Sequence, residues 1–153
     1  YLPRAFFVPK AIVLDRDNIL QKLKEKEFNP KEAVLIEKQI NKSLNNKGIY
    51  KEAKIEFYSP NKIEIRINNE APGFLVLSEV WYPGWKAFDN GKETEIYKAD
   101  YILRAIYLEK GEHKIDFIYD PLSFRVGLLI TGITSLFIII YLVSLLSLFK
   151  SRP

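Results

Sequence analysis

The sequence VGLLITGITSLFIIIYLVSLLSLF, from Val126 to Phe149, contains no charged residue over 24 positions. As an α-helix it extends about 36 Å at 1.5 Å per residue, whereas the hydrocarbon core of a bilayer is about 30 Å thick. Arg125 and Lys150 bracket the run, and long basic side chains at such positions reach lipid head groups. A buried core helix is the alternative, but core helices are usually shorter and amphipathic. The run therefore predicts one transmembrane helix over residues 126–149.

The segment before this run has a different composition. It holds all 19 acidic residues and all but two of the 23 basic ones, with Lys and Glu interspersed. Nucleic-acid binding needs a clustered basic surface, so we expect no nucleic-acid partner. The sequence has no Cys, which excludes disulfides, thiol catalysis and thiolate metal sites.

From Lys51 onward, apolar residues recur at every second position. The alternation runs through 53–57, is interrupted by a turn at 59–61, and resumes at 63–67. It predicts a hairpin with one face toward a core and one toward water. Further strands are predicted at 74–81, 85–88, 93–97, 101–108 and 112–119, with hairpin turns at 89–92 and 109–111. Six or seven strands at this spacing favour an antiparallel β-sandwich.

Residues 1–50 mix short strands with a helix. Apolar runs at 4–8, 11–14 and 33–36 predict strands. Asp17 is the expected N-cap of a helix that continues to about Phe28, before Asn29-Pro30. The predicted fold class is therefore mainly β: an antiparallel β-sandwich with a small N-terminal α/β element and one C-terminal transmembrane α-helix. Its expected parts are 1–50 (α/β), 51–120 (antiparallel β, same domain), 121–125 (linker), 126–149 (transmembrane helix) and 150–153 (cytoplasmic tail).

Charge near the helix ends bears on orientation. Lys150 and Arg152 favour a cytoplasmic C-terminus, which places the globular part outside the cell. Lys110, Lys114 and Arg125 lie close to the other end of the helix. Charge by itself therefore favours this orientation only slightly.

The turn Trp81-Tyr82-Pro83-Gly84-Trp85 is unusually specific in composition. Pro presets φ at the first central position, and Gly supplies the positive φ of a type II turn. Pro83 and Gly84 are thus the candidate structural turn, and Trp81, Tyr82 and Trp85 are candidate ligand or interface aromatics. Three interpretations remain open: packing into the end of the sandwich, stacking on a sugar or acyl chain, or anchoring at a membrane interface.

The titratable residues define no catalytic or metal site in this sequence. His113 is the only His, whereas zinc takes three or four ligands, and we expect it to be structural. The Ser residues lack a His/Asp pairing pattern, a Gly-rich phosphate loop is absent, and we expect no cofactor. Arg104 lies in an apolar strand, where it pairs with Asp100 or Glu79 or meets a lipid phosphate; the structural ion pair is favoured.

Two stretches carry a family resemblance: PGFLVLSEVWYPGWKAF at 72–88 and NGKETEIYKADYILRAIYLEKGEHKIDFIYDPLSFRVGL at 90–128. They closely resemble the C-terminal part of the YfhO family of bacterial membrane proteins. The family pattern is a Y-P-G-W turn, a D-G-K hairpin, a strand containing Arg, a G-x-H strand ending in Pro, and a final transmembrane helix. The matching segments are 82–85, 90–92, 99–106 and 111–121, and LPRAFFV at 2–8 resembles the family's lead into this domain. Asp89-Asn90-Gly91 departs by one residue from the usual V-D-G-K, which alters the hairpin tip.

The resemblance implies a function for a longer protein. YfhO proteins resemble polytopic glycosyltransferases of the C superfamily, which implies a polyprenyl-phosphate-linked sugar donor and acceptors among cell-envelope polymers or lipids. The essential acidic residue of that superfamily lies in an early extracytoplasmic loop that this chain does not contain, so no catalytic residue is carried over. The chain begins at Tyr1 and has no Met, as expected of a C-terminal piece.

We therefore expect a non-catalytic extracytoplasmic domain and anchor in the cell membrane, belonging to a glycosyltransferase. The expected partners are the lipid bilayer, the remaining transmembrane helices, and the polyprenyl-phosphate sugar or envelope glycopolymer. The alternative is a stand-alone, membrane-anchored carbohydrate-binding or interaction module. A series of apolar segments upstream favours the first interpretation, and a signal peptide favours the second.

Overall fold

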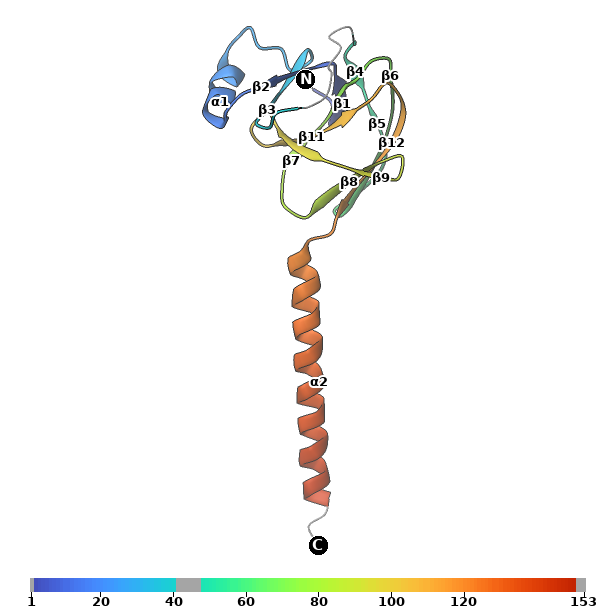
Figure 1. The fold of residues 1–153 in the computed structure, drawn as a ribbon. Coiled ribbons are helices and arrows are strands. Elements are labelled where there is room, and N and C mark those ends of the chain that lie inside the picture. Colours follow the sequence, from blue (N-terminus) through green and yellow to red (C-terminus); the bar gives the residue numbers. More distant parts are fainter. Residues whose placement is uncertain (1, 41–47, 151–153) are drawn as a thin grey trace. The chain divides into compact units, whose positions relative to one another are not determined.

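The computed structural model describes residues 2–40 and 48–150, and the chain divides into two compact units between Tyr119 and Asp120. The first unit contains all of the described strands and one short helix (Figure 1). The second unit is built on a single long helix. The mainly β fold class predicted from the sequence is confirmed.

Seven strands form the larger sheet, sheet A, in the order β2-β3-β10-β11-β7-β1-β4. They are β1 (Ala5–Val8), β2 (Lys10–Val13), β3 (Ala33–Ile36), β4 (Lys51–Glu52), β7 (Gly73–Val80), β10 (Ile96–Ala99) and β11 (Leu103–Leu108). Only β2 and β3 pair in parallel among the described pairs of this sheet. Parallel pairing needs a crossover connection, and α1 (Arg16–Lys24) supplies it beside these two strands (Figure 1).

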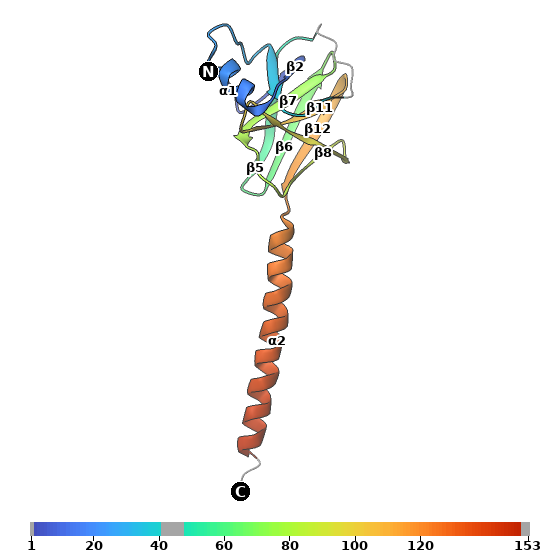
Figure 2. The ribbon, with the colours of Figure 1, turned by 60° about the vertical axis from the view of Figure 1, so that its left-hand side comes forward.

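Five strands form sheet B, in the order β5-β6-β12-β8-β9. They are β5 (Lys54–Ser59), β6 (Lys62–Asn69), β8 (Trp85–Asp89), β9 (Lys92–Thr94) and β12 (Gly111–Tyr119). Figure 2 shows β5, β6, β12 and β8 side by side. All of these pairs are antiparallel, and the hairpins predicted around 59–61 and 89–92 are confirmed.

The two sheets face each other across an apolar core. Sheet A contributes Phe7, Leu75 and Ile106 among others, and sheet B contributes the alternate residues of β6 and β12, such as Ile65 and Phe117. The period-two pattern predicted at 63–67 is thus the inward face of β6. On β5 the pattern fails at Phe57, which is 48% exposed because the pairing register shifts between Ile55 and Phe57. This packing is the sandwich that the strand spacing predicted.

Sheet A is also buried on the face that points away from sheet B. Phe6, Phe74, Val76 and Tyr107 lie there in a second apolar cluster, which Leu2 and other partly buried side chains cover. Burial on both faces explains why β1, β7 and β11 read as continuous apolar runs instead of alternating patterns.

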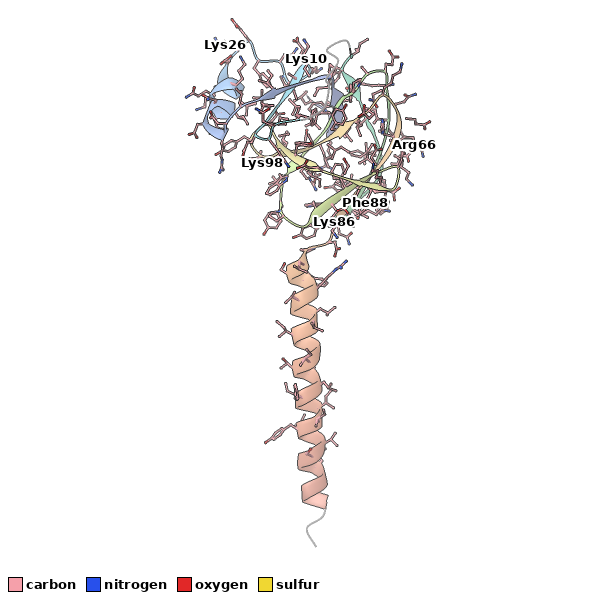
Figure 3. The ribbon with its side chains drawn as sticks, viewed as in Figure 1. Lys10, Lys26, Arg66, Lys86, Phe88 and Lys98 are labelled. Carbon is pink, nitrogen blue, oxygen red and sulfur yellow. The ribbon has the colours of Figure 1, made fainter. Side chains whose placement is uncertain are left out.

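The outer face of sheet B is polar, with charges of opposite sign on neighbouring strands. Arg66 on β6 pairs with Glu56 on β5 at 3.0 Å and with Glu112 on β12 at 3.4 Å. Figure 3 shows Lys10, Arg66 and Lys98 on separate parts of the β unit. This arrangement agrees with the interspersed charge of the sequence.

The helix α1 differs from its prediction at both ends. Its N-cap is Asp15 instead of Asp17, because Oδ1 of Asp15 accepts the backbone N–H of Asn18 at 2.9 Å. Asp17 lies in the first turn, where a negative charge interacts favourably with the helix dipole. The helix ends at Lys24, four residues before Phe28. Asp15 and Asp17 carry the same capping carboxylate two residues apart. The local sequence pattern does not show which of them precedes the first turn, and the prediction of Asp17 is wrong.

Two predicted strand connections are wrong. The single strand expected at 93–97 is divided into β9 in sheet B and β10 in sheet A. The hairpin expected around 109–111 does not form, since β11 pairs with β7 and β10 while β12 pairs with β6 and β8. At both places the chain crosses from one sheet to the other. A local turn signal shows where a strand ends but not which strand becomes its partner.

The second unit contains α2 (Leu122–Lys150), which begins four residues before the predicted Val126. Most of the segment 121–125, expected as a linker, is therefore helical. The guanidinium of Arg125 donates from Nε to Oδ1 of Asp120 at 2.8 Å, across the first turn. Leu122–Ser144 is long and apolar enough to cross a membrane, and its apolar side chains are exposed. Residues 151–153 of the expected cytoplasmic tail lie outside the described residues.

Three hydroxyl side chains within α2, those of Thr131, Thr134 and Ser144, donate to backbone carbonyls of the helix. Thr131 donates its hydroxyl to the carbonyl of Gly127, and Thr134 donates to that of Ile130, each at 2.9 Å. Such back-bonding removes the cost of placing a hydroxyl in hydrocarbon. The Thr residues are thus compatible with a membrane-spanning segment.

Candidate functional site

The aromatic turn joins sheet A to sheet B. β7 ends at Val80, β8 begins at Trp85, and the chain turns at Pro83-Gly84. Gly84 has φ of 101°, in the region that the second central residue of a type II turn requires. The N–H of Trp81 donates to the carbonyl of Ile102 at 2.6 Å, which fixes the start of this connection against the β10–β11 turn.

The three aromatic residues of the turn have different environments. Trp85 is partly buried against the core between the sheets, and its ring centroid lies 5.3 Å from that of Tyr119. Tyr82 is 60% exposed, with its ring 6.4 Å from the Tyr119 ring, and Trp81 is 36% exposed. Trp85 is therefore a packing residue, whereas Trp81 and Tyr82 present ring surface to solvent.

A buried arginine lies against Trp85. Arg104 is 1% exposed, and its guanidinium carbon is 4.0 Å from the ring centroid of Trp85 and 5.6 Å from that of Phe117. Its Nη2 donates to Oε2 of Glu79 at 3.0 Å. Burial lowers the pKa of Arg104, and the charge of Glu79 opposes this effect. The favoured prediction of a structural ion pair is confirmed, with Glu79 as the partner.

Glu79 connects this arginine to the surface. The hydroxyl of Tyr58 donates to Oε1 of Glu79 at 2.9 Å, and Nε of Arg4 lies 3.6 Å from the same oxygen. Arg4 also lies over the Tyr58 ring, 4.5 Å from its centroid. The hydrogen bond to Glu79 raises the pKa of Tyr58. Sequence reasoning missed Arg4 and Tyr58. The one local signal for this network was Arg104, a charged residue within an apolar strand.

Asp100 and His113 make contacts elsewhere in the β unit. Oδ1 of Asp100 accepts the N–H of Leu35 at 2.9 Å, and burial raises the pKa of Asp100 to about 6. Nδ1 of His113 lies 2.8 Å from Asp89, and its Nε2 lies 2.9 Å from the carbonyl of Glu109. Both ring nitrogens of His113 therefore have protein partners, as a structural histidine requires.

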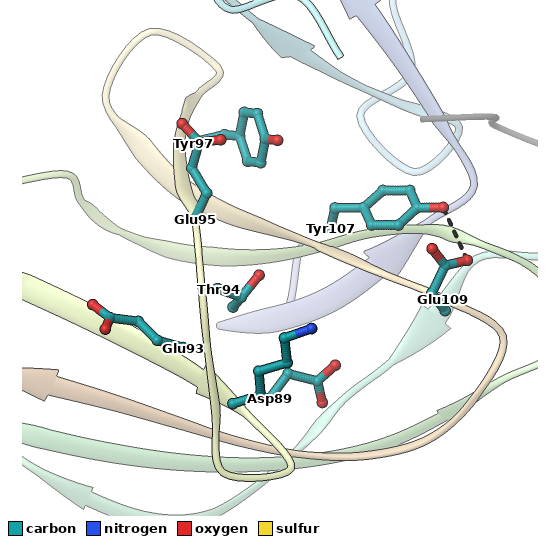
Figure 4. Close-up of a pocket in the computed structure, with 8 residues that line it drawn as sticks. Asp89, Glu93, Thr94, Glu95, Tyr97, Tyr107 and Glu109 are labelled. Carbon is teal, nitrogen blue, oxygen red and sulfur yellow. Dashed lines mark hydrogen bonds between the residues drawn. The ribbon is translucent and has the colours of Figure 1, made fainter. Parts of the chain in front are cut away.

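A cleft of about 330 Å³ opens beside β9, β10 and β11, and Figure 4 shows the residues that line it. Tyr107 donates its hydroxyl to Glu109 at 3.2 Å, and burial together with Glu109 raises the pKa of Tyr107 to about 12. Burial also raises the pKa of Tyr97. Because these phenols stay protonated at neutral pH, the cleft combines phenol donors with carboxylate acceptors. The lining residues are Asp89, Lys92, Glu93, Thr94, Glu95, Tyr97, Tyr107 and Glu109.

The cleft contains none of the candidate site residues predicted from the sequence, which are those of the aromatic turn at 81–85. Asp89 and Glu93 lie on β8 and β9, whereas Glu95 and Glu109 lie in the connections β9–β10 and β11–β12. Their arrangement depends on how the two sheets pair. Within residues 2–40 and 48–150, the structure places no three His, Asp or Glu side chains so that they hold a metal ion.

A β-sandwich unit followed by an apolar helix of membrane-spanning length defines a membrane protein with a globular β domain. The model of the family described as Bacterial membrane protein YfhO matches residues 22–131, and the chain belongs to this family.

A curated relative in this family is the uncharacterized protein YfhO of Bacillus subtilis (strain 168), which is 25% identical over 85 residues. The match covers 56% of this chain and 10% of the relative, so the chain spans about a tenth of that protein's length. No solved structure matches the chain.

Proposed function

We propose that this chain is the extracytoplasmic accessory domain and membrane anchor of a larger glycosyltransferase. In this proposal the enzyme takes its sugar from a polyprenyl-phosphate carrier and modifies cell-envelope polymers or lipids. Membership in the YfhO family supports it, together with the resemblance of that family to C-superfamily glycosyltransferases. The observation that carries it is the apolar span Leu122–Ser144, which follows the last strand after only two residues. A β unit on such an anchor stays near a membrane surface, where lipid-linked donors are found.

The accessory role assigns the chemistry to another part of the longer protein. The β unit then positions the acceptor or braces the catalytic loops, and α2 packs against the remaining transmembrane helices. Gly127, Thr131 and Ser135 share a four-residue spacing on α2, and small residues at this spacing favour close helix packing.

The outward orientation is tested with single cysteines, because the chain has none of its own. With a cysteine at Lys110, a membrane-impermeant maleimide should label intact cells. With a cysteine at Ser151, labelling should require permeabilised membranes. The opposite labelling pattern places the β unit in the cytoplasm and contradicts the proposal.

The catalytic assignment is tested in the full-length protein that contains this chain. Membranes with and without that protein receive a radiolabelled polyprenyl-phosphate sugar, and transfer to envelope polymer or lipid is measured. Transfer should depend on the protein, and each amide variant of the cleft (Asp89→Asn, Glu93→Gln, Glu95→Gln, Glu109→Gln) should retain turnover. Loss of a general acid or base costs about 10²–10⁴-fold in rate. A loss of that size in any one variant shows that this chain contributes to catalysis.

The second candidate function is a carbohydrate-binding module, and the cleft is the observation that favours it. Carboxylate acceptors beside protonated phenols can hydrogen-bond the hydroxyls of a sugar. Titration of the chain in detergent with envelope oligosaccharides should then shift the tyrosine signals of the cleft, and Tyr107→Phe should weaken binding. Saturable binding without any sugar transfer by the full-length protein favours this second function.

A further inference from the structure

Four exposed apolar side chains lie together at one end of the sandwich. Val80 is 62% exposed, Trp81 36%, Tyr82 60% and Ile102 48%. The first three end β7 and begin the aromatic turn, while Ile102 belongs to the β10–β11 turn. The backbone hydrogen bond from Trp81 to Ile102 and the pairing of Val80 with Leu103 bring the two segments together. We call these four residues the aromatic patch.

Side-chain contacts within the β unit support the aromatic patch. Tyr82 packs against Tyr119, and the next aromatic of the turn, Trp85, packs against both Tyr119 and the buried Arg104. The Pro83-Gly84 turn restricts the backbone between them. Exposed apolar surface costs about 25 cal/mol per Å², and contiguous exposed apolar residues mark interaction sites. The exposure of these neighbouring apolar side chains therefore points to a binding surface.

The short connection between β12 and α2 points to a lipid surface as the partner of the aromatic patch. Tyr119, which contacts the patch residue Tyr82, is the last residue of β12, and α2 begins at Leu122. A chain spans at most about 3.6 Å per residue, so the three residues from Tyr119 to Leu122, the first residue of the membrane span, reach at most about 11 Å. This limit follows from chain length alone. It keeps the aromatic patch within reach of the bilayer surface that α2 enters.

The residue types also fit the head-group region. Trp and Tyr concentrate at membrane interfaces, because their rings are apolar and their N–H and O–H groups remain hydrated. Val80 and Ile102 add aliphatic surface beside them, and the patch itself carries no charge.

We propose that the aromatic patch inserts into the head-group region of the bilayer and so gives the β unit a second membrane contact in addition to α2. The proposal rests on membrane anchoring by α2 and does not depend on sugar transfer, so it can hold or fail separately from the glycosyltransferase assignment.

The test uses the two tryptophans of the chain as its own probes. The full chain carrying Trp85→Phe is reconstituted into phosphatidylcholine–phosphatidylglycerol vesicles, and Trp81 is the remaining emitter. Lipids brominated near the head group should quench Trp81 more than lipids brominated deep in the acyl chain. Acrylamide should quench Trp81 less than it quenches free tryptophan. A Trp81 that brominated lipids do not quench and that acrylamide reaches freely overturns the proposal.

A matched control places the probe at the other end of β12. Lys110→Trp, in a chain with Trp81→Phe and Trp85→Phe, lies nine residues from Tyr119, about 30 Å along the strand at 3.3 Å per residue. This probe should escape lipid quenching, and equal quenching at both positions also overturns the proposal.

A second readout keeps both native tryptophans, in case Trp85→Phe perturbs folding. Tyr82→Asp and Ile102→Asp change exposed side chains and should reduce lipid quenching of the native tryptophans. Unchanged quenching in both variants contradicts insertion of the patch. Emission that responds to envelope oligosaccharides and not to brominated lipids assigns the patch to sugar stacking instead.

Discussion

The guanidinium carbon of Arg104 lies 4.0 Å from the centroid of the Trp85 ring. Arg104 belongs to β11 in sheet A and Trp85 to β8 in sheet B, so this contact joins the two sheets at one end of the core. Glu79 supplies the carboxylate that partners the buried charge. Trp85 is therefore a packing residue between the sheets. The exposed rings of Trp81 and Tyr82 remain available to a partner.

We expect Arg104→Ala to destabilise the β unit by about 3 kcal/mol, since it removes a buried side chain packed on Trp85 and leaves Glu79 with only the Tyr58 hydroxyl and the exposed Arg4 as partners. Urea unfolding of the chain in detergent micelles, followed by tryptophan fluorescence, measures this change. Arg66→Ala is the matched control because Arg66 pairs with Glu56 and Glu112 on the exposed face of sheet B. It should shift the urea midpoint much less than Arg104→Ala does, because solvent screens an exposed ion pair. Equal effects of the two substitutions show that Arg104 is not a specific structural contact.

The two tryptophans should differ in their effect on stability. Trp85→Ala removes a ring packed against the core and Arg104, and we expect a loss of about 3 kcal/mol. Trp81→Ala removes a partly exposed ring and should cost less than about 1 kcal/mol. Far-UV circular dichroism during urea unfolding follows both variants without relying on tryptophan emission. A larger loss for Trp81 than for Trp85 contradicts the assigned environments.

Gly73 should tolerate no side chain, because β7 passes close to β1 at this position. A Cβ added there lies 2.5 Å from the carbonyl oxygen of Val8 and 2.4 Å from Cζ of Phe7. We expect Gly73→Ala to cost about 2 kcal/mol through forced backbone movement. Gly132→Ala in α2 meets nothing within 4 Å and should leave the urea midpoint of the β unit unchanged. An unchanged midpoint for Gly73→Ala as well is incompatible with this strand packing.

The stability of the β unit should depend on pH through Asp100. Burial raises the pKa of Asp100 from 3.8 to about 6 on folding. Between these two pKa values the folded chain binds more protons than the unfolded chain, so this contribution to stability falls as pH rises from about 4 to 6. The loss is on the order of 3 kcal/mol above that interval.

Asp100→Asn should remove this dependence. The amide keeps an oxygen for the N–H of Leu35, and Asn tolerates the positive φ of 44° at this position. Urea midpoints at pH 4 and pH 7.5 should therefore differ less in the variant than in the native chain, with the variant the more stable of the two at pH 7.5. A native chain that gains stability between pH 4 and 6 relative to the variant would refute the raised pKa.

Membrane insertion of α2 should be sensitive to charge at its centre. Ile133 lies midway along the span Leu122–Ser144, and Ile133→Lys should disfavour insertion by about 3 kcal/mol. Leu122→Lys at the start of the span should have little effect, because the side chain can reach the head groups. Alkaline extraction of membranes measures the inserted fraction. Full insertion of both variants excludes Ile133 from the hydrocarbon core.

Much of the fold could be predicted from the sequence because the decisive signals are local. The uncharged run at 126–149 predicted the membrane helix, and the period-two alternation at 53–67 predicted the β5–β6 hairpin. The motifs around Tyr82–Trp85 and Gly111–Pro121 indicated the YfhO family, which the family match shows. Apolarity, strand period and turn residues each depend on neighbours within a few positions.

Tertiary structure alone decided which strands pair and which side chains are buried together. The sequence predicted a hairpin where β11 and β12 in fact belong to different sheets. It marked Trp81 and Trp85 alike, yet Trp85 rests on Arg104 while Trp81 and Tyr82 stay partly exposed. Strand partners and burial follow from the free energy of packing two sheets across one core. That energy is summed over contacts between residues far apart in the chain, so no local pattern contains it.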